Sequence, residues 1–274
     1  MIRRLLLPVV LCAATGCAPS ETLSVASSGS TSFAPPAATR AARDHRSSIT
    51  IVTYNVNFGL AGDPSSVEAI ATSEADLVLL QETNEDWEEA LRAALSDRYP
   101  HRRFHHCCRA GGLAILSRFP VHPRRVLHPD VAWFPAWRVD VDSPIGTLQT
   151  LNVHLRPNVT DSGSVVLGLL TTPRVRTTEM ETYVEALDAD LPAIVAGDFN
   201  EEAGGGLRVL EARGLRAVAP AGRASTWRWS TSLGEVDASL DHVVVSPELV
   251  ADEPRVLRSG RSDHFPVAVE LRLR

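Results

Sequence analysis

Val195-Ala196-Gly197-Asp198-Phe199-Asn200 is the stretch that decides the fold. The apolar residues from Ala193 onward predict a buried strand that runs to Asn200 and is followed by a Gly-rich segment. Because side chains alternate along a strand, Asp198 and Asn200 point the same way at its carboxyl end. Strand ends bind ligands in layered α/β folds, and this pair can hold a water, a phosphate or a hard metal ion. Gly, Asp and Asn are also ordinary turn residues, so the stretch alone leaves both a turn and a site open.

The composition fits one large domain or two small ones. The chain has 274 residues and is 44% apolar, which is enough for a well-buried core. Its formal net charge is −6, and all 27 basic residues are Arg. An acidic chain is a poor passive binder of nucleic acid. A hydrolase that brings cations to a phosphodiester remains open.

Residues 1–16 have the pattern of a signal peptide. Two Arg residues precede a short apolar core, residues 5–14, which is too short for a permanent membrane span. Ala14-Thr15-Gly16-Cys17 resembles a bacterial lipobox, with cleavage before Cys17 and a lipid on its thiol, although Leu is the usual residue at the place of Ala14. The alternative is ordinary secretion with cleavage nearby. We therefore expect an exported protein, either a lipoprotein of the bacterial cell envelope (periplasm or outer membrane) or a secreted protein.

The segment after the signal peptide predicts a tether. Residues 17–47 are rich in Ser, Ala, Thr, Pro and Gly, with almost no large apolar side chains, which indicates a flexible, lipid-anchored linker. Residues 48–274 contain neither a second linker of this kind nor an internal repeat. We therefore expect one folded domain over residues 48–274, and a monomer held to the membrane by its N-terminal lipid anchor.

Two adjacent cysteines, Cys107 and Cys108, remain in the folded part. In an oxidising compartment they can form a vicinal disulfide. With His105 and His106 they also form a run of soft metal ligands. Adjacent residues seldom converge on one ion, so we interpret the run as structural or incidental.

Two predicted strands in the first half carry polar side chains at their ends. Ile49–Val56 is β-rich with Asn55 near its end, and Asp76–Gln81 is apolar and closed by Glu82. A buried Asn needs hydrogen-bond partners. An amphipathic helix follows Glu82, so a helix-start acid is an alternative explanation of this carboxylate.

The second half of the chain also carries polar side chains at the ends of predicted strands. Ala136–Val141 and Thr147–Leu155 predict a hairpin, with His154 at the end of its second strand. A lone His there is usually structural, so its interpretation depends on its neighbours. Leu240–Ser246 predicts a buried strand with Asp241 near its start, where a charge needs a partner.

The order of the predicted elements indicates the fold class. Helices are expected after Glu82, over Thr171–Ala189 and over Leu207–Arg213, whereas strands often follow each other directly. We expect Val121–Leu127 to pair with the strand over residues 111–118. This pattern predicts an α/β or α+β sandwich of two sheets with helices outside, not a Rossmann or barrel chain.

Six short motifs occur in order, each at a predicted strand end or in a loop. They are Thr53-Tyr54-Asn55-Val56, Leu80-Gln81-Glu82, Val153-His154-Leu155, Gly197-Asp198-Phe199-Asn200, Leu240-Asp241-His242 and Ser262-Asp263-His264. Together they resemble the endonuclease/exonuclease/phosphatase superfamily, which includes pancreatic-type deoxyribonuclease, apurinic endonucleases, neutral sphingomyelinases and inositol phosphatases. Each motif alone is weak. All six in order, from about residue 49 to the end, are specific.

The resemblance implies a four-layered α/β/β/α sandwich of two mostly antiparallel sheets with outer helices. It also implies a hydrolase of phosphate esters that uses Mg²⁺ or Mn²⁺. Carried over to this sequence, Glu82 is the main metal ligand, assisted by Asn55 and by Asp263 through oxygen or water.

The resemblance also assigns catalytic roles. Asp198 and Asn200 orient the attacking water and touch the phosphate. His264 acts on the phosphate as acid, base or electrostatic clamp and is held by Asp241, while His154 binds a phosphoryl oxygen. These roles agree with elementary chemistry, because a phosphodiester is anionic and needs positive charge aimed at its nonbridging oxygens. A hard divalent ion on carboxylate and amide oxygens supplies that charge, and His carries protons near neutral pH.

The resulting expectation is a metal-dependent phosphodiesterase or nuclease that acts outside the cytoplasm on nucleic acid or on a phospholipid headgroup. A sphingomyelinase-like phospholipid or inositol-phosphate hydrolase is one alternative, and a non-catalytic binding module on the same scaffold is another. None of the six motifs is damaged, which argues against the binding module.

Surface patterns bear on the substrate. In a nuclease we expect Arg residues that contact the nucleic-acid strand, and the candidates are Arg102-Arg103 and Arg124-Arg125. Both pairs are equally explained as solvated surface residues. A lipid hydrolase predicts an apolar, membrane-facing hairpin, and its candidate is Trp133–Trp137, which we interpret as core or groove wall. Arg118 supports either its loop or the site, and the sequence leaves both roles open. His242 is expected to have no effect on activity.

Overall fold

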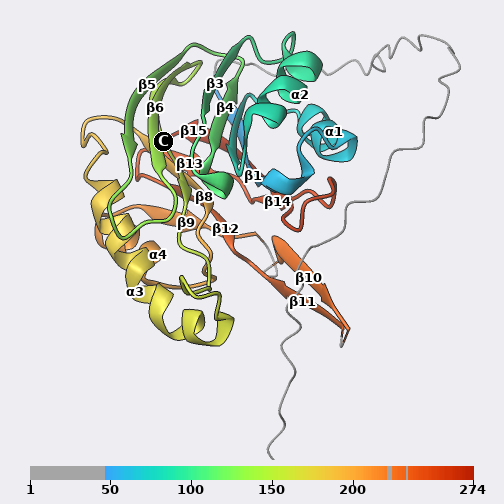
Figure 1. The fold of residues 1–274 in the computed structure, drawn as a ribbon. Helices are drawn as coiled ribbons and strands as arrows, with labels where there is room; N and C mark the ends of the chain where they lie inside the picture. Colours follow the sequence, from blue (N-terminus) through green and yellow to red (C-terminus); the bar gives the residue numbers. More distant parts are fainter. Residues whose placement is uncertain (1–46, 221–223, 233) are drawn as a thin grey trace, which may run out of the picture. The chain divides into compact units, whose positions relative to one another are not determined.

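Two mixed β-sheets pack face to face at the centre of the molecule, with helices on their outer faces (Figure 1). The structure is a computed structural model that describes residues 47–220, 224–232 and 234–274. The predicted signal peptide, residues 17–46 of the predicted linker and the lipidation candidate Cys17 lie outside the described residues. All described elements belong to one compact unit, Ala42–Arg274. That unit contains its own hydrophobic cores.

The first sheet has seven strands. They are β1 (Ile49–Asn55), β2 (Leu77–Gln81), β3 (His101–His105), β4 (Leu113–Ser117), β13 (Leu249–Ala251), β14 (Arg255–Val256) and β15 (Val267–Leu273). Their order is β13-β15-β1-β2-β4-β3, and β14 pairs with β15. β1 and β2 are parallel, and the other pairs are antiparallel.

The second sheet has six strands. A separate two-stranded hairpin occurs in the chain between the last two of these strands. The strands are β5 (Val121–Leu127), β6 (Ala136–Ser143), β7 (Gly146–His154), β8 (Ala193–Asp198), β9 (Arg216–Val218) and β12 (Asp241–Val245). Their order is β5-β6-β7-β8-β12-β9, and β7 and β8 are parallel. The hairpin consists of β10 (Trp227–Thr231) and β11 (Gly234–Ala238).

Short polar side chains begin the longer helices. The described helices are α1 (Pro64–Thr72), α2 (Glu85–Leu95), α3 (Val165–Val184) and α4 (Gly205–Ala212), with 3₁₀ turns η1 (Phe58–Leu60) and η2 (Arg109–Gly111). Asp63, Asn84 and Ser164 precede α1, α2 and α3, and each accepts a hydrogen bond from a backbone N–H of the first turn. None of the helices in the described ranges combines the length and the apolar character needed to cross a membrane.

Three hydrophobic cores separate the four layers. The central core is formed by the inward faces of both sheets, for example Ile51 with Ile194 and Val243. A second core joins the outer face of the first sheet to α1 and α2 through Ile70 and Trp87. A third joins the second sheet to α3 and α4. The arrangement confirms the predicted α/β/β/α sandwich of two mostly antiparallel sheets.

Two local predictions were wrong. β5 pairs with β6 in the second sheet, and β4 pairs with β2 and β3 in the first, so the expected pairing of Val121–Leu127 with residues 111–118 does not form. The third helix covers Val165–Val184 and not Thr171–Ala189. Its first turns are apolar on several sides and therefore lack the helical periodicity on which the prediction relied.

Candidate active site

The carboxyl ends of the central strands of both sheets meet at one point. Asn55 ends β1, and its amide nitrogen donates to Glu82 Oε1 at 3.0 Å and to Asp198 Oδ2 at 3.1 Å. Asn55 therefore links the carboxylate that follows β2 in one sheet to the carboxylate that ends β8 in the other. The backbone N–H of Phe58 donates to the other oxygen of Glu82 at 3.2 Å. Glu82 is held in this position with a left-handed backbone, φ 62°.

Asp198 is brought beside His154 by the parallel pairing of β7 and β8, in which these two residues are register partners. His154 Nε2 lies 3.5 Å from Asp198 Oδ2 and 4.0 Å from Glu82 Oε1. Gly197 makes the close approach possible, because a Cβ at that position would lie 1.9 Å from the carbonyl oxygen of Val153. Its φ of 151° is also one that side chains rarely adopt.

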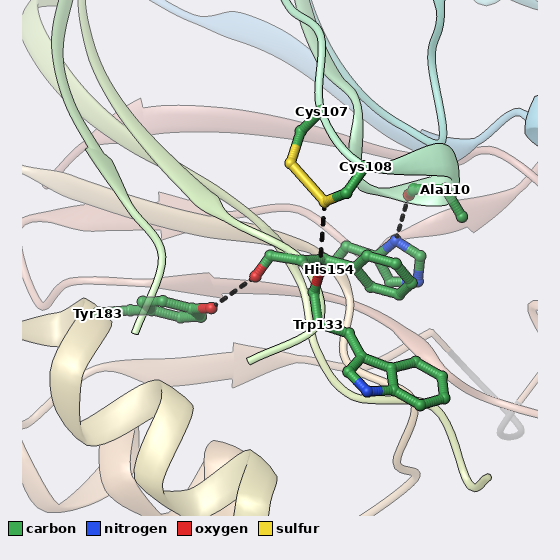
Figure 2. Close-up of a disulfide and its surroundings, with 7 residues drawn as sticks. Cys107, Cys108, Ala110, Trp133, His154 and Tyr183 are labelled. Carbon is green, nitrogen blue, oxygen red and sulfur yellow. Dashed lines mark hydrogen bonds between the residues drawn. A yellow bond between two sulfur atoms is a disulfide. The ribbon is translucent and has the colours of Figure 1, made fainter. Parts of the chain in front are cut away.

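The other ring nitrogen of His154 faces η2 (Figure 2). His154 Nδ1 lies 3.3 Å from the carbonyl oxygen of Ala110, so Nδ1 carries the proton and donates. The ring also stacks on Phe134, with 4.2 Å between centroids. Burial is the largest influence on this imidazole and lowers its pKa. The neutral ring therefore directs the lone pair of Nε2 toward Asp198. Nε2 carries a proton only when the ring is charged.

Cys107 and Cys108 form a disulfide next to this turn. Cys108 Sγ lies 3.4 Å from the carbonyl oxygen of Trp133, and Figure 2 shows the two cysteines beside Ala110 and His154. The vicinal disulfide considered from the sequence is thus present. The sulfur atoms are bonded to each other and are not thiolate metal ligands.

His264 is held by Asp241 from β12. Its Nδ1 donates to Asp241 Oδ2 at 2.9 Å, and its Nε2 lies 3.6 Å from Asp198 Oδ2. Thr226 Oγ1 donates to the same Asp241 oxygen at 2.6 Å. Burial opposes the charged ring, but the carboxylates of Asp241 and Asp198 outweigh it and raise the pKa of His264 to about 10. His264 is therefore an imidazolium that points Nε2–H at Asp198.

Asp263 lies next to His264, and both of its oxygens accept hydrogen bonds. Asn57 Nδ2 donates to Oδ1 and Trp227 Nε1 donates to Oδ2, each at 3.0 Å. Burial alone would raise the pKa of Asp263, but the charge of His264 and these donors lower it. Asp263 is therefore an ionised carboxylate at the rim of the site.

The site has the charge and donor chemistry that a hard divalent cation requires. Burial raises the pKa of Glu82 and of Asp198 despite their hydrogen bonds, so a positive charge beside them would favour both ionised carboxylates. Potential ligand atoms of Asp198, Asp241 and His264 lie within 4.8 Å of one another, but His264 is protonated and bonded to Asp241. Asp198 is therefore the member of this group that is left for a cation, and Asn55 holds it beside Glu82. Carboxylate oxygens are the ligands that Mg²⁺ prefers. The residues present therefore fit a divalent ion at this strand end.

These side chains form the floor of a cleft of about 640 Å³. The walls are mainly apolar and include Phe58, Phe134, Val159, Val165, Leu169, Trp227, Trp229 and Val236. Six predicted site residues line the cleft, namely Glu82, His154, Asp198, Asn200, Asp263 and His264. Asn55 and Asp241 lie behind them and hold them through the hydrogen bonds described above.

Comparison with known proteins gives the same assignment as the motifs. The model of the endonuclease/exonuclease/phosphatase family matches residues 52–264. The chain belongs to this family. The match covers most of both sheets and all six motifs, from within β1 to His264, so the family predicted from these motifs is confirmed. A search of curated protein sequences gave no match.

Three solved structures have a similar fold. An endonuclease/exonuclease/phosphatase from Beutenbergia cavernae is 20% identical with a TM-score of 0.60, and the match covers 83% of this chain and 72% of that one. TDP2 from Caenorhabditis elegans is 13% identical with a TM-score of 0.60, covering 82% and 74%. ANGEL2, a 2′,3′-cyclic phosphatase solved with adenosine-2′,3′-vanadate, is 16% identical with a TM-score of 0.58, covering 82% and 96%. At these identities the similarity concerns the fold alone.

All eight predicted side chains of the family site are therefore brought together, but their positions refine the expected roles. Asn55 offers its amide nitrogen to Glu82 and Asp198, while its oxygen accepts from the backbone N–H of Asn57 at 3.1 Å. It thus holds two carboxylates in place, and direct metal ligation by Asn55 stays a prediction. Asn200 Nδ2 donates to the carbonyl oxygen of Leu155, and its backbone N–H donates to Asp198 Oδ1.

The sequence analysis missed Asn57, Thr226 and Trp227, which hold Asp263 and Asp241. Asn57 is two residues from Asn55 and shares its motif region, which is a usable signal. Thr226 and Trp227 carry no local signal, because only the chain reversal into β10 brings them to the site. Arg118 and His242 have structural roles. Arg118 pairs with Asp76 at 2.9 Å, away from the cleft, and His242 contacts the carbonyl oxygen of Glu201.

A buried charge network supports the loop after Asn200. Arg176 of α3 pairs with Glu201 at 3.2 Å, and Glu201 also accepts from the backbone N–H of Leu207 at the start of α4. Glu179, one turn along α3, accepts from the backbone N–H of Arg156 at 3.0 Å. Burial is the largest influence on Glu179 and raises its pKa from about 4.5 to about 7.

Glu179 should make the stability of the fold depend on pH. Because its pKa is higher in the folded protein, the folded state binds more protons between pH 4.5 and 7. The resulting stabilisation is complete below about pH 4.5 and is lost as the pH rises through 7, by about 3 kcal/mol in all. Urea unfolding from pH 4.5 to 8 should show this fall in the wild type and a flatter profile in Glu179→Gln. Parallel profiles for the two proteins would refute the assignment.

Proposed function

We propose that the chain hydrolyses a phosphodiester with the help of a divalent cation bound at Glu82, Asp263 and Asp198. The observation that carries the proposal is the surroundings of Asp198, whose Oδ2 faces Asn55 Nδ2 and both imidazoles, His154 and His264, within 3.1–3.6 Å. Such a carboxylate orients a nucleophilic water and accepts its proton, while the charged ring of His264 lies beside it. When bound, Mg²⁺ or Mn²⁺ supplies charge stabilisation at the phosphoryl oxygens.

The catalytic roles of the other side chains depend on their protonation states. His264, an imidazolium fixed by Asp241, donates Nε2–H to a nonbridging oxygen and neutralises its developing charge. Nε2 of His154 carries no proton in the neutral ring. It therefore donates to a phosphoryl oxygen only after the negative charge of the bound phosphodiester has favoured protonation of the ring. Asn200 is kept beside Asp198 by its backbone hydrogen bond and lines the cleft where the phosphate would lie.

The lining of the cleft favours a lipid phosphodiester over a nucleic-acid strand. Among the described residues that line it, no Arg is present, and the walls are aromatic and aliphatic. The two Arg pairs suggested as a nucleic-acid grip lie on β3 and β5, and Arg124 pairs with Asp140 at 2.6 Å. A polyanion requires several cationic contacts along its path. A single phosphodiester attached to an apolar group fits this cleft better, and a nuclease remains the competing proposal.

A substrate panel tests the function. Residues 42–274 should hydrolyse bis-p-nitrophenyl phosphate in Mg²⁺ or Mn²⁺, lose the activity in EDTA and regain it when the ion is restored. Sphingomyelin and phosphatidylcholine in mixed micelles should be cleaved faster than plasmid DNA, RNA or inositol phosphates. Hydrolysis that persists in EDTA, or no cleavage of any of these substrates, would refute the proposal, and a clear preference for DNA or RNA would favour the nuclease.

A further inference from the structure

The first two turns of α3 leave an apolar run exposed. The exposed fractions are 54% for Val165, 75% for Val166, 53% for Leu167, 55% for Leu169 and 75% for Leu170. At about 100° per residue these five side chains cover an arc of about 200° around the helix, while Gly168 and Thr172 face the protein. We call the five the α3 surface. Folded monomers seldom expose so many adjacent large apolar side chains unless something binds them.

The β10–β11 hairpin exposes a second apolar face. Trp229 and Val236 are register partners, with exposed fractions of 58% and 50%. Trp227 and Ala238 form the next pair on the same face. The charged side chains of the hairpin alternate onto its opposite face. We call these four residues the hairpin face.

Both surfaces border the catalytic cleft. Val165 and Leu169 of the α3 surface and Trp229 and Val236 of the hairpin face line the same cleft whose floor carries His264. In Figure 1 the yellow-green start of α3 and the orange hairpin lie at the same end of the domain. Whatever covers these surfaces therefore also covers or feeds the mouth of the active site.

We propose that the α3 surface and the hairpin face dock on a lipid interface of neutral, zwitterionic headgroups and so present a phosphodiester of that interface to the cleft. The proposal rests on the proposed function. Residues 162–173 carry no charge, so an apolar and not an electrostatic attraction has to hold the surface. A second copy of the chain seated here would close the mouth of the cleft, whereas a lipid interface supplies the substrate through it.

The N-terminal sequence supports the same partner independently. The expected lipid anchor at Cys17 and the expected linker over residues 17–47 would tether the domain to a membrane. A flexible linker of the expected length would span about 30 Å on average and would keep the domain close to the lipid surface. Tethering raises the local concentration of the interface, so a weak apolar docking surface is sufficient.

Vesicle binding tests the proposal without depending on catalysis or on the lipid anchor. Residues 42–274, the compact unit with its own cores, should co-sediment with phosphatidylcholine vesicles, and added phosphatidylglycerol should not strengthen the binding. Val166→Ser/Leu170→Ser should reduce the partition coefficient at least tenfold, because two inserted side chains lose their apolar burial. The control Val126→Ser/Leu273→Ser changes two exposed apolar residues on β5 and β15 and should bind as the wild type does.

The possible outcomes separate docking from function. Wild-type protein that stays in the supernatant, a strict need for anionic lipid, or equal binding by the α3 variant and the wild type would each overturn the proposal. A concentration-dependent dimer that the α3 variant abolishes, without vesicle binding, would overturn it in favour of a second copy. Vesicle binding by a protein that cleaves neither a soluble diester nor a phospholipid would support docking while refuting the proposed function. Hydrolysis of bis-p-nitrophenyl phosphate should be the same in wild type and α3 variant.

Discussion

Glu82→Gln is expected to lower kcat/KM for phosphodiester hydrolysis at least a hundredfold, which corresponds to about 3 kcal/mol of transition-state stabilisation. Glu82 supplies a partly buried carboxylate whose pKa is raised by its loss of hydration and whose oxygens face the strand-end site. The amide has the same shape but no charge, so it holds a divalent cation far less strongly. Steady-state kinetics in Mg²⁺ with bis-p-nitrophenyl phosphate, together with calorimetric titration of Mn²⁺, measure both effects.

The fold should tolerate this change, because the variant removes a buried charge and keeps an oxygen as acceptor. Glu85→Gln is the matched control, since Glu85 is exposed at the start of α2, three residues along the chain. Its activity should stay within a factor of two of the wild type. If Glu82→Gln retained metal-dependent hydrolysis at the wild-type rate, Glu82 would not be the metal ligand.

The second large effect is expected for His264→Gln, with a loss of at least a hundredfold in kcat and little change in KM. His264 is the charged ring that Asp241 holds at 2.9 Å and that aims Nε2 at Asp198. A glutamine can occupy the space but carries no positive charge and transfers no proton. Single-turnover kinetics would separate the chemical step from substrate binding.

Asp241→Asn reveals whether Asp241 acts through His264. If it does, Asp241→Asn should be severely impaired in wild-type background but should cost little more in the His264→Gln background. The pH profile gives a second readout, because without the Asp241 carboxylate the pKa of His264 should fall toward its ordinary range. Additive losses in the double variant would show that the two residues act separately.

The sequence was sufficient for the parts of the site that lie on strands. Strand alternation and apolar runs locate the ends of β1, β2, β7, β8 and β12, and each end carries one of the predicted polar residues. Asn55, Glu82 and Asp198 then meet because the parallel pair β1–β2 of one sheet and the parallel pair β7–β8 of the other end at the same end of the sandwich. Their proximity follows from topology, and topology was supplied by the resemblance of the ordered motifs to a known family.

The parts that sequence did not predict depend on loops and on exposure. The contacts of Thr226 with Asp241 and of Trp227 with Asp263 arise from a chain reversal that has no periodic signal. The segment Trp133–Trp137, in contrast, was interpreted correctly as core or groove wall, since Phe134 and Trp137 are buried and Phe134 lines the cleft. The exposed apolar surface lies instead on α3, where an apolar run looks the same in the sequence whether it faces core or solvent.

Left-handed backbone at the site links strain to chemistry. Glu82 and Asn200 have φ of 62° and 52°, a conformation that costs a residue with a side chain about 1 kcal/mol and glycine almost nothing. Glycine would relieve this strain at either position, but it would also remove the carboxylate or the carboxamide. Part of the stability that the fold could have is therefore given up to hold these two polar groups at the strand ends.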